Sequence, residues 1–299
     1  MEKIKVAIVG YGNVGRYALE ALEAAPDMEV AGIVRRNGNE NCPLELTKYH
    51  VVKDIRDLGK VDVAILACPT RSCPKYAKIM VTLGINTVDS FDIHTSIQEY
   101  RSELMLRNKE TKTVSVIAAG WDPGSDSIVR TLMQSLAPKG LSYTNFGPGM
   151  SMGHSVCVRS KEGVRNALSV TIPLGEGIHR RMVYVELEEG HSLEQVTAEI
   201  KADPYFANDE THVFAVDSVD EVRDMGHGVN LVRKGVSGKT QNQRFEFNMS
   251  INNPALTGQV LVNVARATMR LKPGCYTMVE IPVIDMLPGD REEWIGKLV

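Results

Sequence analysis

The chain has 299 residues, more than one compact core usually holds, so we expect two domains. Its 43% hydrophobic and 24% charged residues are typical of a soluble globular protein, and its net charge of −3 argues against nucleic acid or an anionic membrane as partner. No apolar stretch reaches the roughly 18 residues of a membrane span, and the N-terminus leads directly into a strand, so we expect a cytoplasmic protein.

The first predicted elements are a strand, a glycine-rich turn and a helix. An apolar run at 6–9 ends in Gly10-Tyr11-Gly12-Asn13-Val14-Gly15, and helix-forming residues continue to Pro26. The first glycine permits a tight turn, the second lets a pyrophosphate approach the backbone, and the third lets the helix pack closely on the strand. The helix N-terminus adds free N–H groups and a positive dipole end. The pattern predicts a dinucleotide site, and a turn without a ligand is the alternative.

The end of the second strand, expected at 29–34, indicates which dinucleotide binds. An NAD site usually has an Asp or Glu about 20 residues after the glycines. Here the strand is followed by Arg35 and Arg36, and no carboxylate occurs before Glu40. Two guanidinium groups suit the 2′-phosphate of NADP by charge and by their forked donors, whereas a solvated surface pair is the alternative. We therefore expect NADP.

A buried strand is expected at 61–68, and the loop after it contains Cys68, Pro69 and Thr70. Loops at the carboxyl ends of strands line the cofactor crevice of a doubly wound sheet, so these residues are predicted to contact the cofactor. Ordinary turn chemistry is the alternative. The spacing of Cys68 and Cys73 fits neither a redox motif nor a zinc site, and the chain has no H-E-x-x-H motif. We expect structural thiols and no metal.

Two later strands each deliver an aspartate just after their carboxyl ends. A helix at 74–83 leads to a strand at 85–88 and then to Asp92, and a helix at 95–109 leads to a strand at 113–119 and then to Asp122. The fold places substrate groups at such positions. Helix capping is the alternative for both residues, because Asp often begins a helix.

The pattern changes near residue 142. A glycine-rich loop is expected at 143–154, and His227 is expected in a second loop, between two glycines. Period-2 alternation predicts strands, with one helix at 192–202, and the strands are expected at 167–172, 180–187, 212–216 and 244–251.

The whole pattern predicts an α/β protein with a Rossmann-type, doubly wound parallel sheet and a second α+β domain with an open mixed sheet. The first domain is expected at 1–120 and the second, which binds substrate and dimerises, at 121–253. A helix at 255–271 and a strand at 277–282 are expected to return to the first domain, so that 254–299 completes it.

Several longer motifs resemble those of the meso-diaminopimelate dehydrogenase family. They are the opening residues 4–16, the run Asp89-Ser90-Phe91-Asp92-Ile93-His94, the run Ala119-Gly120-Trp121-Asp122-Pro123-Gly124, and residues 146–154. The similarity extends to Asn252-Asn253-Pro254 and the final helix. The W-D-P-G and G-P-G-x-S-x-G-H stretches are more specific than the glycine turn. The resemblance implies NADP-dependent oxidative deamination of meso-2,6-diaminopimelate at its D-centre, giving L-2-amino-6-oxopimelate and ammonia in lysine biosynthesis, by a homodimer.

The resemblance also implies which residues bind the substrate. Asp92 and Asp122 would be catalytic, holding the amine and stabilising the iminium charge. The full substrate-binding set would be Asp92, Trp121, Asp122, Phe146, Met152, Gly153, Thr171, Arg181, His227 and Asn253. Within this set Arg181, Thr171 and His227 would grip the distal carboxylate, and Asn253 would either cap its helix or reach the distal amino group. The general base stays open.

Two other kinds of protein are alternatives. One is a different two-domain NADP oxidoreductase, such as a dihydrodipicolinate reductase or an aspartate or homoserine dehydrogenase. The other is an NADP-sensing regulator without turnover, which would need a partner-facing or basic DNA-binding segment. The chain has neither kind of segment.

Overall fold

The computed structural model describes residues 2–222 and 226–299. It divides the chain into two compact units: unit 1 is Met1–Thr131 with Pro254–Val299, and unit 2 is Leu132–Asn253. The helix α4 (Ser125–Leu136) runs across the division.

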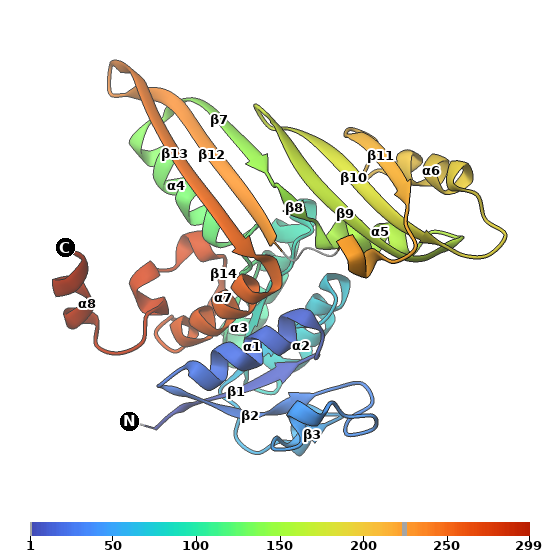
Figure 1. Cartoon of the computed structure of the whole chain (residues 1–299). Helices are drawn as coiled ribbons and strands as arrows, with labels where there is room; N and C mark the ends of the chain where they lie inside the picture. The colour runs from blue at the N-terminus through green and yellow to red at the C-terminus, as the bar shows by residue number, and fades with distance from the viewer. Residues whose placement is uncertain (1, 223–225) are drawn as a thin grey trace. The chain divides into compact units, whose positions relative to one another are not determined.

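Unit 1 is built on a seven-stranded sheet whose strand pairs are all parallel (Figure 1). The order is β14-β6-β5-β4-β1-β2-β3, so the chain direction across the sheet reverses between β1 and β4. This reversal is the topological switch point at which a doubly wound sheet binds its ligand. The predicted Rossmann-type fold is therefore confirmed. The strands are β1 (Ile4–Val9), β2 (Met28–Val34), β3 (Val51–Val52), β4 (Val63–Leu66), β5 (Asn86–Asp89), β6 (Val114–Val116) and β14 (Gly274–Tyr276).

Two buried clusters form the core of unit 1, one on each face of the sheet. Successive strand side chains point to opposite faces, so in β1 Val6 and Ile8 join one cluster while Ala7 and Val9 join the other. The first cluster includes residues of α1 and α7, and the second includes residues of α2 and α3. These helices are α1 (Asn13–Ala24), α2 (Cys73–Thr82), α3 (Ile97–Thr111) and α7 (Asn253–Thr268).

The C-terminal segment is fastened to unit 1. Strand β14 pairs with β6, and Arg266 of α7 forms an ion pair with Asp27 at 2.6 Å. The strand predicted at 277–282 is wrong, because β14 ends at Tyr276 and a capping box between Thr277 and Glu280 begins a 3-10 turn instead. The residues after this segment contain the helix α8 (Arg291–Leu298).

Unit 2 contains two sheets rather than one. The four-stranded sheet has the order β11-β10-β9-β8, and the three-stranded sheet has the order β13-β12-β7. Among the described strands of unit 2, only β10 and β11 pair in parallel, so the mixed character is confirmed. Helices α5 and α6 share a buried cluster with β9 and β10. The elements are β7 (Lys139–Phe146), β8 (Gly149–Met150), α5 (Met152–Arg159), β9 (Val164–Gly175), β10 (Ile178–Leu187), α6 (Leu193–Ala202), β11 (Glu210–Ala215), β12 (Gly226–Ser237) and β13 (Thr240–Asn252).

The loop predicted at 143–154 is largely wrong, because it contains the end of β7 and the start of α5. Only the turn between them depends on glycine. Gly147 has φ +97°, and a Cβ there would lie 2.3 Å from the Thr171 carbonyl oxygen. Gly149 has φ +144°, and a Cβ there would lie 2.1 Å from the Gly226 carbonyl oxygen. Glycine thus marks close backbone approach rather than a long loop.

The loop predicted around His227 is also wrong. His227 lies in β12 and pairs with Ile251 of β13, and only 6% of its surface is exposed. The following glycine permits a close strand approach, since a Cβ at Gly228 would stand 2.8 Å from the Met249 carbonyl oxygen. Met225, which comes before the first of the two glycines beside His227, lies outside the described residues.

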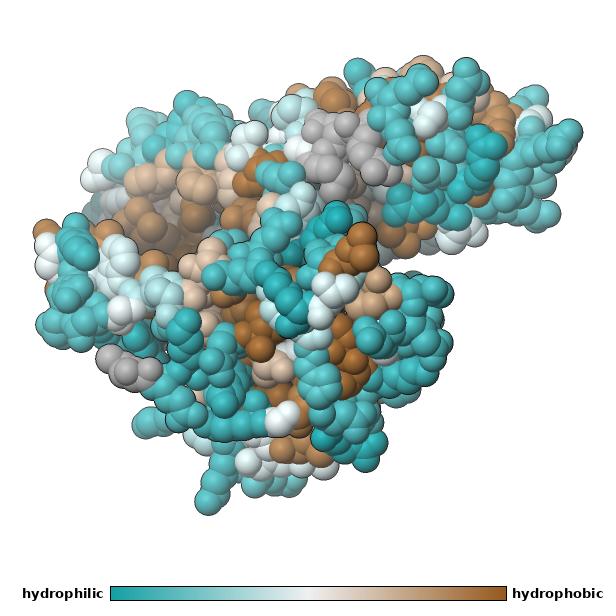
Figure 2. All heavy atoms as spheres, turned by 60° about the horizontal axis from the view of Figure 1, so that its bottom comes forward, coloured by the Kyte–Doolittle hydropathy of each residue, from teal (hydrophilic) through white to brown (hydrophobic). Residues whose placement is uncertain are grey.

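Hydrophilic residues cover most of the face shown in Figure 2. Within the described part of the chain, no helix is long and apolar enough to cross a membrane. Large apolar side chains are nevertheless exposed at single positions of unit 2, including Leu141 of β7 at 64% and Ile178 of β10 at 61%.

Candidate functional site

The glycine turn lies at the switch point of the unit 1 sheet, and its three glycines have different environments. Gly10 has φ +97°, and a Cβ there would stand 2.6 Å from the Ala67 carbonyl oxygen. A Cβ at Gly15 would stand 2.5 Å from the Gly10 carbonyl oxygen. At Gly12 nothing lies within 4 Å of a Cβ. The first and third glycines are therefore required by the packing of the chain, whereas the second faces open space.

The first turn of α1 has several features that favour an anion. Gly12 is the N-cap residue, no side chain caps the helix, and no acidic residue lies in its first turn. The N–H groups there and the positive end of the helix dipole suit a phosphate. Asn13 is exposed, while Tyr11 and Val14 pack against the core.

Arg35 and Arg36 follow β2, as the sequence predicts, but differ in environment. The Arg35 guanidinium donates to the Gly38 carbonyl oxygen at 3.0 Å and thereby closes its own loop. Arg36 is exposed. The loop after them borders a hollow of about 580 Å³ lined by residues 37–40, 51–53 and 57. Lys53 of this hollow forms an ion pair with Glu40 at 2.7 Å.

The loop after β4 lies beside the glycine turn. A Cβ at Gly10 would stand 3.1 Å from the Cys68 backbone nitrogen. Pro69 precedes a 3-10 turn that begins at Thr70, and the Thr70 Oγ1 accepts a hydrogen bond from the Asp92 N–H at 3.2 Å. The predicted cofactor loop is thus connected directly to the loop that carries a predicted catalytic residue.

Asp89, which the sequence did not single out, joins the loops that carry the two predicted catalytic aspartates. Its carboxylate is fully buried and accepts from the N–H groups of Phe91 and Ala118 at 3.0 and 3.3 Å and from the Tyr100 hydroxyl at 2.7 Å. Burial raises the pKa of Asp89 to about 6. The only sequence signal was an acidic residue at the end of an apolar strand.

Asp92 is exposed and caps neither of the next two helical segments, whose N-cap residues are Ile93 and Ser96. Asp122 likewise is not adjacent to α4, because that helix begins three residues later, at Ser125. Capping therefore explains neither aspartate. Beside Asp122, only 7% of the Trp121 surface is exposed.

Asp122 shares one guanidinium with a second aspartate. Arg130 Nη1 lies 3.1 Å from Asp122 Oδ1, and Arg130 Nη2 lies 2.7 Å from Asp126 Oδ2. The Asp122 side chain is 14% exposed, whereas that of Asp126 is completely buried. The sequence prediction did not include Asp126 or Arg130, although their spacing of four residues on a helix is a recognisable ion-pair signal.

In unit 2, Thr171 and Arg181 pair directly across β9 and β10, and Arg181 donates to the Thr171 hydroxyl oxygen. Arg181 also forms an ion pair with Asp209 at 2.6 Å, and their side chains are 11% and 19% exposed. The predicted carboxylate clamp therefore already has a carboxylate neighbour, which the sequence prediction missed.

Phe146 and His227 lie near the same turn of unit 2. The Phe146 N–H donates to His179 Nε2 at 2.8 Å, and the rings of the two residues are 5.6 Å apart. A Cβ at Gly149 would stand 2.6 Å from His227 Cα. A Cβ at Gly147 would likewise stand close to the Thr171 carbonyl oxygen. The turn thus brings together three predicted residues, namely Phe146, Thr171 and His227.

The remaining predicted substrate residues begin helices. Met152 and Gly153 start α5, and Asn253, which is 4% exposed, starts α7. In α5, His154 is held by Ser151 Oγ at 2.8 Å and by the Tyr205 carbonyl oxygen at 3.0 Å. Burial, and then the charge of Arg181, lowers the pKa of His154 to about 4.

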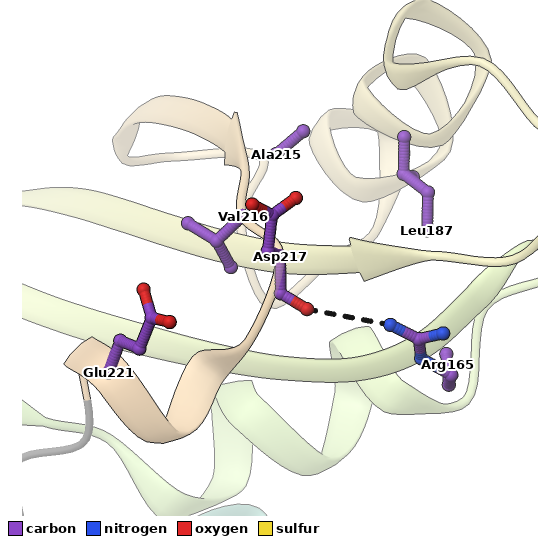
Figure 3. A pocket seen from close by; sticks show the side chains of 6 residues that line it. All are labelled: Arg165, Leu187, Ala215, Val216, Asp217 and Glu221. Carbon is purple, nitrogen blue, oxygen red and sulfur yellow. Dashed lines mark hydrogen bonds between the residues drawn. The ribbon is translucent and has the colours of Figure 1, made fainter.

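A separate hollow of about 520 Å³ lies elsewhere in unit 2 (Figure 3). Within it the Arg165 side chain reaches the Asp217 carbonyl oxygen at 3.5 Å. Its lining residues are Arg165, Leu187, Ala215, Val216, Asp217 and Glu221, and none of them belongs to the predicted set.

A glycine turn at the switch point of a parallel sheet is typical of an NAD(P)-binding domain, and a second unit follows it, as in two-domain oxidoreductases. The model of the oxidoreductase family, NAD-binding Rossmann fold, matches residues 4–117, and that of the diaminopimelic acid dehydrogenase C-terminal domain matches residues 120–253. The chain is 69% identical to the meso-diaminopimelate D-dehydrogenase of Bacteroides fragilis, with 100% of both chains covered. The chain belongs to the meso-diaminopimelate D-dehydrogenase family.

Two more distant members agree with this membership. The meso-diaminopimelate D-dehydrogenase of Acetivibrio thermocellus is 35% identical, with 98% of this chain and 97% of that protein covered. The solved structure of the C. glutamicum DAP dehydrogenase in complex with DAP is 28% identical and superposes with a TM-score of 0.88 over 100% of both chains. The resemblance inferred from sequence motifs is therefore confirmed.

Proposed function

We propose that this enzyme catalyses the reversible, NADP-dependent oxidative deamination of meso-2,6-diaminopimelate at its D-centre. The products are L-2-amino-6-oxopimelate and ammonia, and the reaction is a step of lysine biosynthesis. The observation that carries the proposal is the 69% identity, over the full length, to a meso-diaminopimelate D-dehydrogenase.

The residues of unit 1 fit a dinucleotide. The open space at Gly12 and the uncapped start of α1 suit a pyrophosphate, which the turn Gly10-Tyr11-Gly12-Asn13-Val14-Gly15 would hold. The neighbouring loop would add Cys68, Pro69 and Thr70. When bound, NADP accepts the hydride from the D-carbon.

Arg35 and Arg36 support NADP over NAD. Their guanidinium groups would face the 2′-phosphate, Arg36 from its exposed position and Arg35 from the loop that it closes. In an NAD enzyme a carboxylate at this position would accept from the ribose, and it would repel the phosphate. None stands between β2 and Glu40.

Asp92 and Asp122 would act at the reacting amine. The substrate ammonium must lose a proton before hydride can leave the D-carbon, and positive charge then develops on the resulting iminium. The two carboxylates would accept hydrogen bonds from the nitrogen and stabilise that charge until water attacks the carbon. Trp121, beside Asp122, would wall the site.

The remaining predicted residues would bind the rest of the substrate. Arg181, oriented by Asp209 and Thr171, would hold the distal carboxylate together with Thr171 and His227. The other contacts would come from Phe146, Met152, Gly153 and Asn253.

The proposal is tested by following NADP reduction at alkaline pH with meso-, LL- and DD-diaminopimelate, and with NAD in parallel. We expect reduction with the meso isomer and NADP, and much slower reduction with NAD. Aspartate and homoserine serve as controls for the alternative dehydrogenases. No response to the meso isomer would overturn the proposed reaction.

We also propose that the enzyme is a homodimer that acts in the cytoplasm, where the nicotinamide cofactors are available. The exposed apolar side chains of Leu141 and Ile178 support a protein contact on unit 2. Light scattering at micromolar concentration should give twice the 32.9 kDa mass of the chain. A monomeric mass would contradict the dimer.

A further inference from the structure

We propose that Asp126 receives, through Asp122 and beside Arg130, the proton that the substrate amine releases. This inference rests on the proposed deamination and names the proton acceptor that the sequence left open. Asp126 is a positioning residue in this scheme, because it acts through Asp122 and does not touch the substrate.

The geometry places the two carboxylates side by side. Arg130 contacts Asp122 with one terminal nitrogen and Asp126 with the other, at 3.1 and 2.7 Å. Both nitrogens belong to one planar guanidinium, so the carboxylates that they hold must be close neighbours. The fold fixes this arrangement, since the Asp126 N–H donates to the Trp121 carbonyl oxygen at 3.0 Å.

The charges of this cluster leave room for one proton. Two carboxylates and one guanidinium carry a net charge of −1, and the Asp126 side chain is completely buried. The charged groups with the largest effect on Asp126 are Asp122 and Arg130, and Ser127 is a polar neighbour. Burial, and then the negative charge of Asp122, raises the pKa of Asp126 to about 8. A proton on one carboxyl would then be hydrogen-bonded to the other.

The proton balance is simple. The substrate ammonium gives one proton to the ionised pair, which then holds it between Asp122 and Asp126, and the amine nitrogen becomes neutral. The nitrogen lone pair then forms the C=N bond as the carbon loses its hydride, which a bound NADP would accept. In the amination direction the protonated pair returns the proton. An acceptor with a pKa near the working pH is the efficient one.

The two reaction directions should therefore have opposite pH dependence. Deamination needs the ionised pair, so its kcat should rise through an ionisation near pH 8. Amination needs the protonated pair, so its kcat should fall through the same ionisation. The variant Asp126→Asn keeps the size of the side chain but cannot ionise. In this variant, neither the rise of the deamination kcat nor the fall of the amination kcat near pH 8 should remain; we call these two changes the pH limbs. The kcat at pH 8.5 should fall about tenfold, while KM for both substrates changes less than threefold.

Asp285→Asn is the control for this test, and Arg130→Gln is a second test variant. Asp285→Asn removes another buried carboxylate of unit 1, one paired with Arg270 at 3.3 Å, and should leave both pH limbs in place. Arg130→Gln removes the positive charge beside Asp126, so both limbs should move to higher pH. It serves as the test if Asp126→Asn does not fold.

A readout independent of turnover is carbon NMR of the free protein with labelled aspartate carboxyls. The wild type should show one carboxyl that titrates near pH 8, and Asp126→Asn should lack it. Unchanged pH limbs in Asp126→Asn, or no such titrating carboxyl in the wild type, would overturn the role of Asp126. By contrast, a wild type that does not oxidise meso-diaminopimelate would overturn the proposed function itself.

Discussion

The substitution Gly12→Ala separates the fold of the glycine turn from its role in binding. It adds one methyl group at a position where nothing lies within 4 Å. The backbone there, with φ −102° and ψ −157°, is accessible to alanine. Alanine is a weaker N-cap than glycine, but it also lowers the entropy of the unfolded chain, and these effects oppose each other. We expect the free energy of unfolding to change by less than about 1 kcal/mol.

The effect on the cofactor should be much larger. The added methyl would occupy the space through which a pyrophosphate approaches the first turn of α1. Hydrogen bonds to a charged group contribute about 1.5 to 3 kcal/mol each, so the loss of one weakens binding by about 2 kcal/mol. This free energy corresponds to a roughly 30-fold higher Kd for NADP.

Isothermal titration calorimetry with NADP and urea unfolding measure the two effects separately. The matched control is Gly15→Ala, whose methyl would stand 2.5 Å from the Gly10 carbonyl oxygen. This contact forces the helix away from the strand, so we expect a loss of about 1 to 3 kcal/mol in unfolding free energy. An unchanged Kd in Gly12→Ala would refute the assignment of this turn to the pyrophosphate.

Three further predictions concern other parts of the site. The double variant with Arg35→Ser and Arg36→Ser should raise KM for NADP at least tenfold and change KM for NAD little, and an equal change for both cofactors would exclude 2′-phosphate recognition. Arg181→Ala should lose activity on meso-diaminopimelate but partly keep activity on shorter D-amino acids. It should also cost about 2 kcal/mol of unfolding free energy, because it leaves the Asp209 carboxylate without its cation, and an equal loss on all substrates would argue against a clamp. His154 is neutral when folded and protonates near pH 6.5 when unfolded, so its contribution to stability should fall as pH drops from 6.5 to 4. Urea unfolding should show a smaller loss of unfolding free energy over that pH range in His154→Asn than in the wild type. Equal losses would exclude His154 as a source of this pH dependence.

Short local patterns determined much of unit 1. The parallel sheet, the glycine turn and the two arginines after β2 follow from residues adjacent in sequence. So do the positions of Asp92 and Asp122, because parallel strands place their carboxyl ends at one edge. The misplaced elements were those in which local signals conflict with packing. Glycines inside β12 and just after β7 suggested loops in the sequence, although they allow neighbouring strands to approach closely.

The partners of the site residues were decided only by the tertiary structure. Asp89 holds two loops together because β5 and β6 are adjacent in the sheet. Asp209 forms its ion pair with Arg181 because β10 and β11 are adjacent. The pKa of Asp126 is raised by complete burial and by the charge of Asp122. The sequence alone predicts neither the burial of Asp126 nor its contact with Asp122. The sequence by itself determined which chemical groups are present at the ends of the strands. The fold decided which of them are paired, buried and charged, because those properties depend on residues distant in the chain.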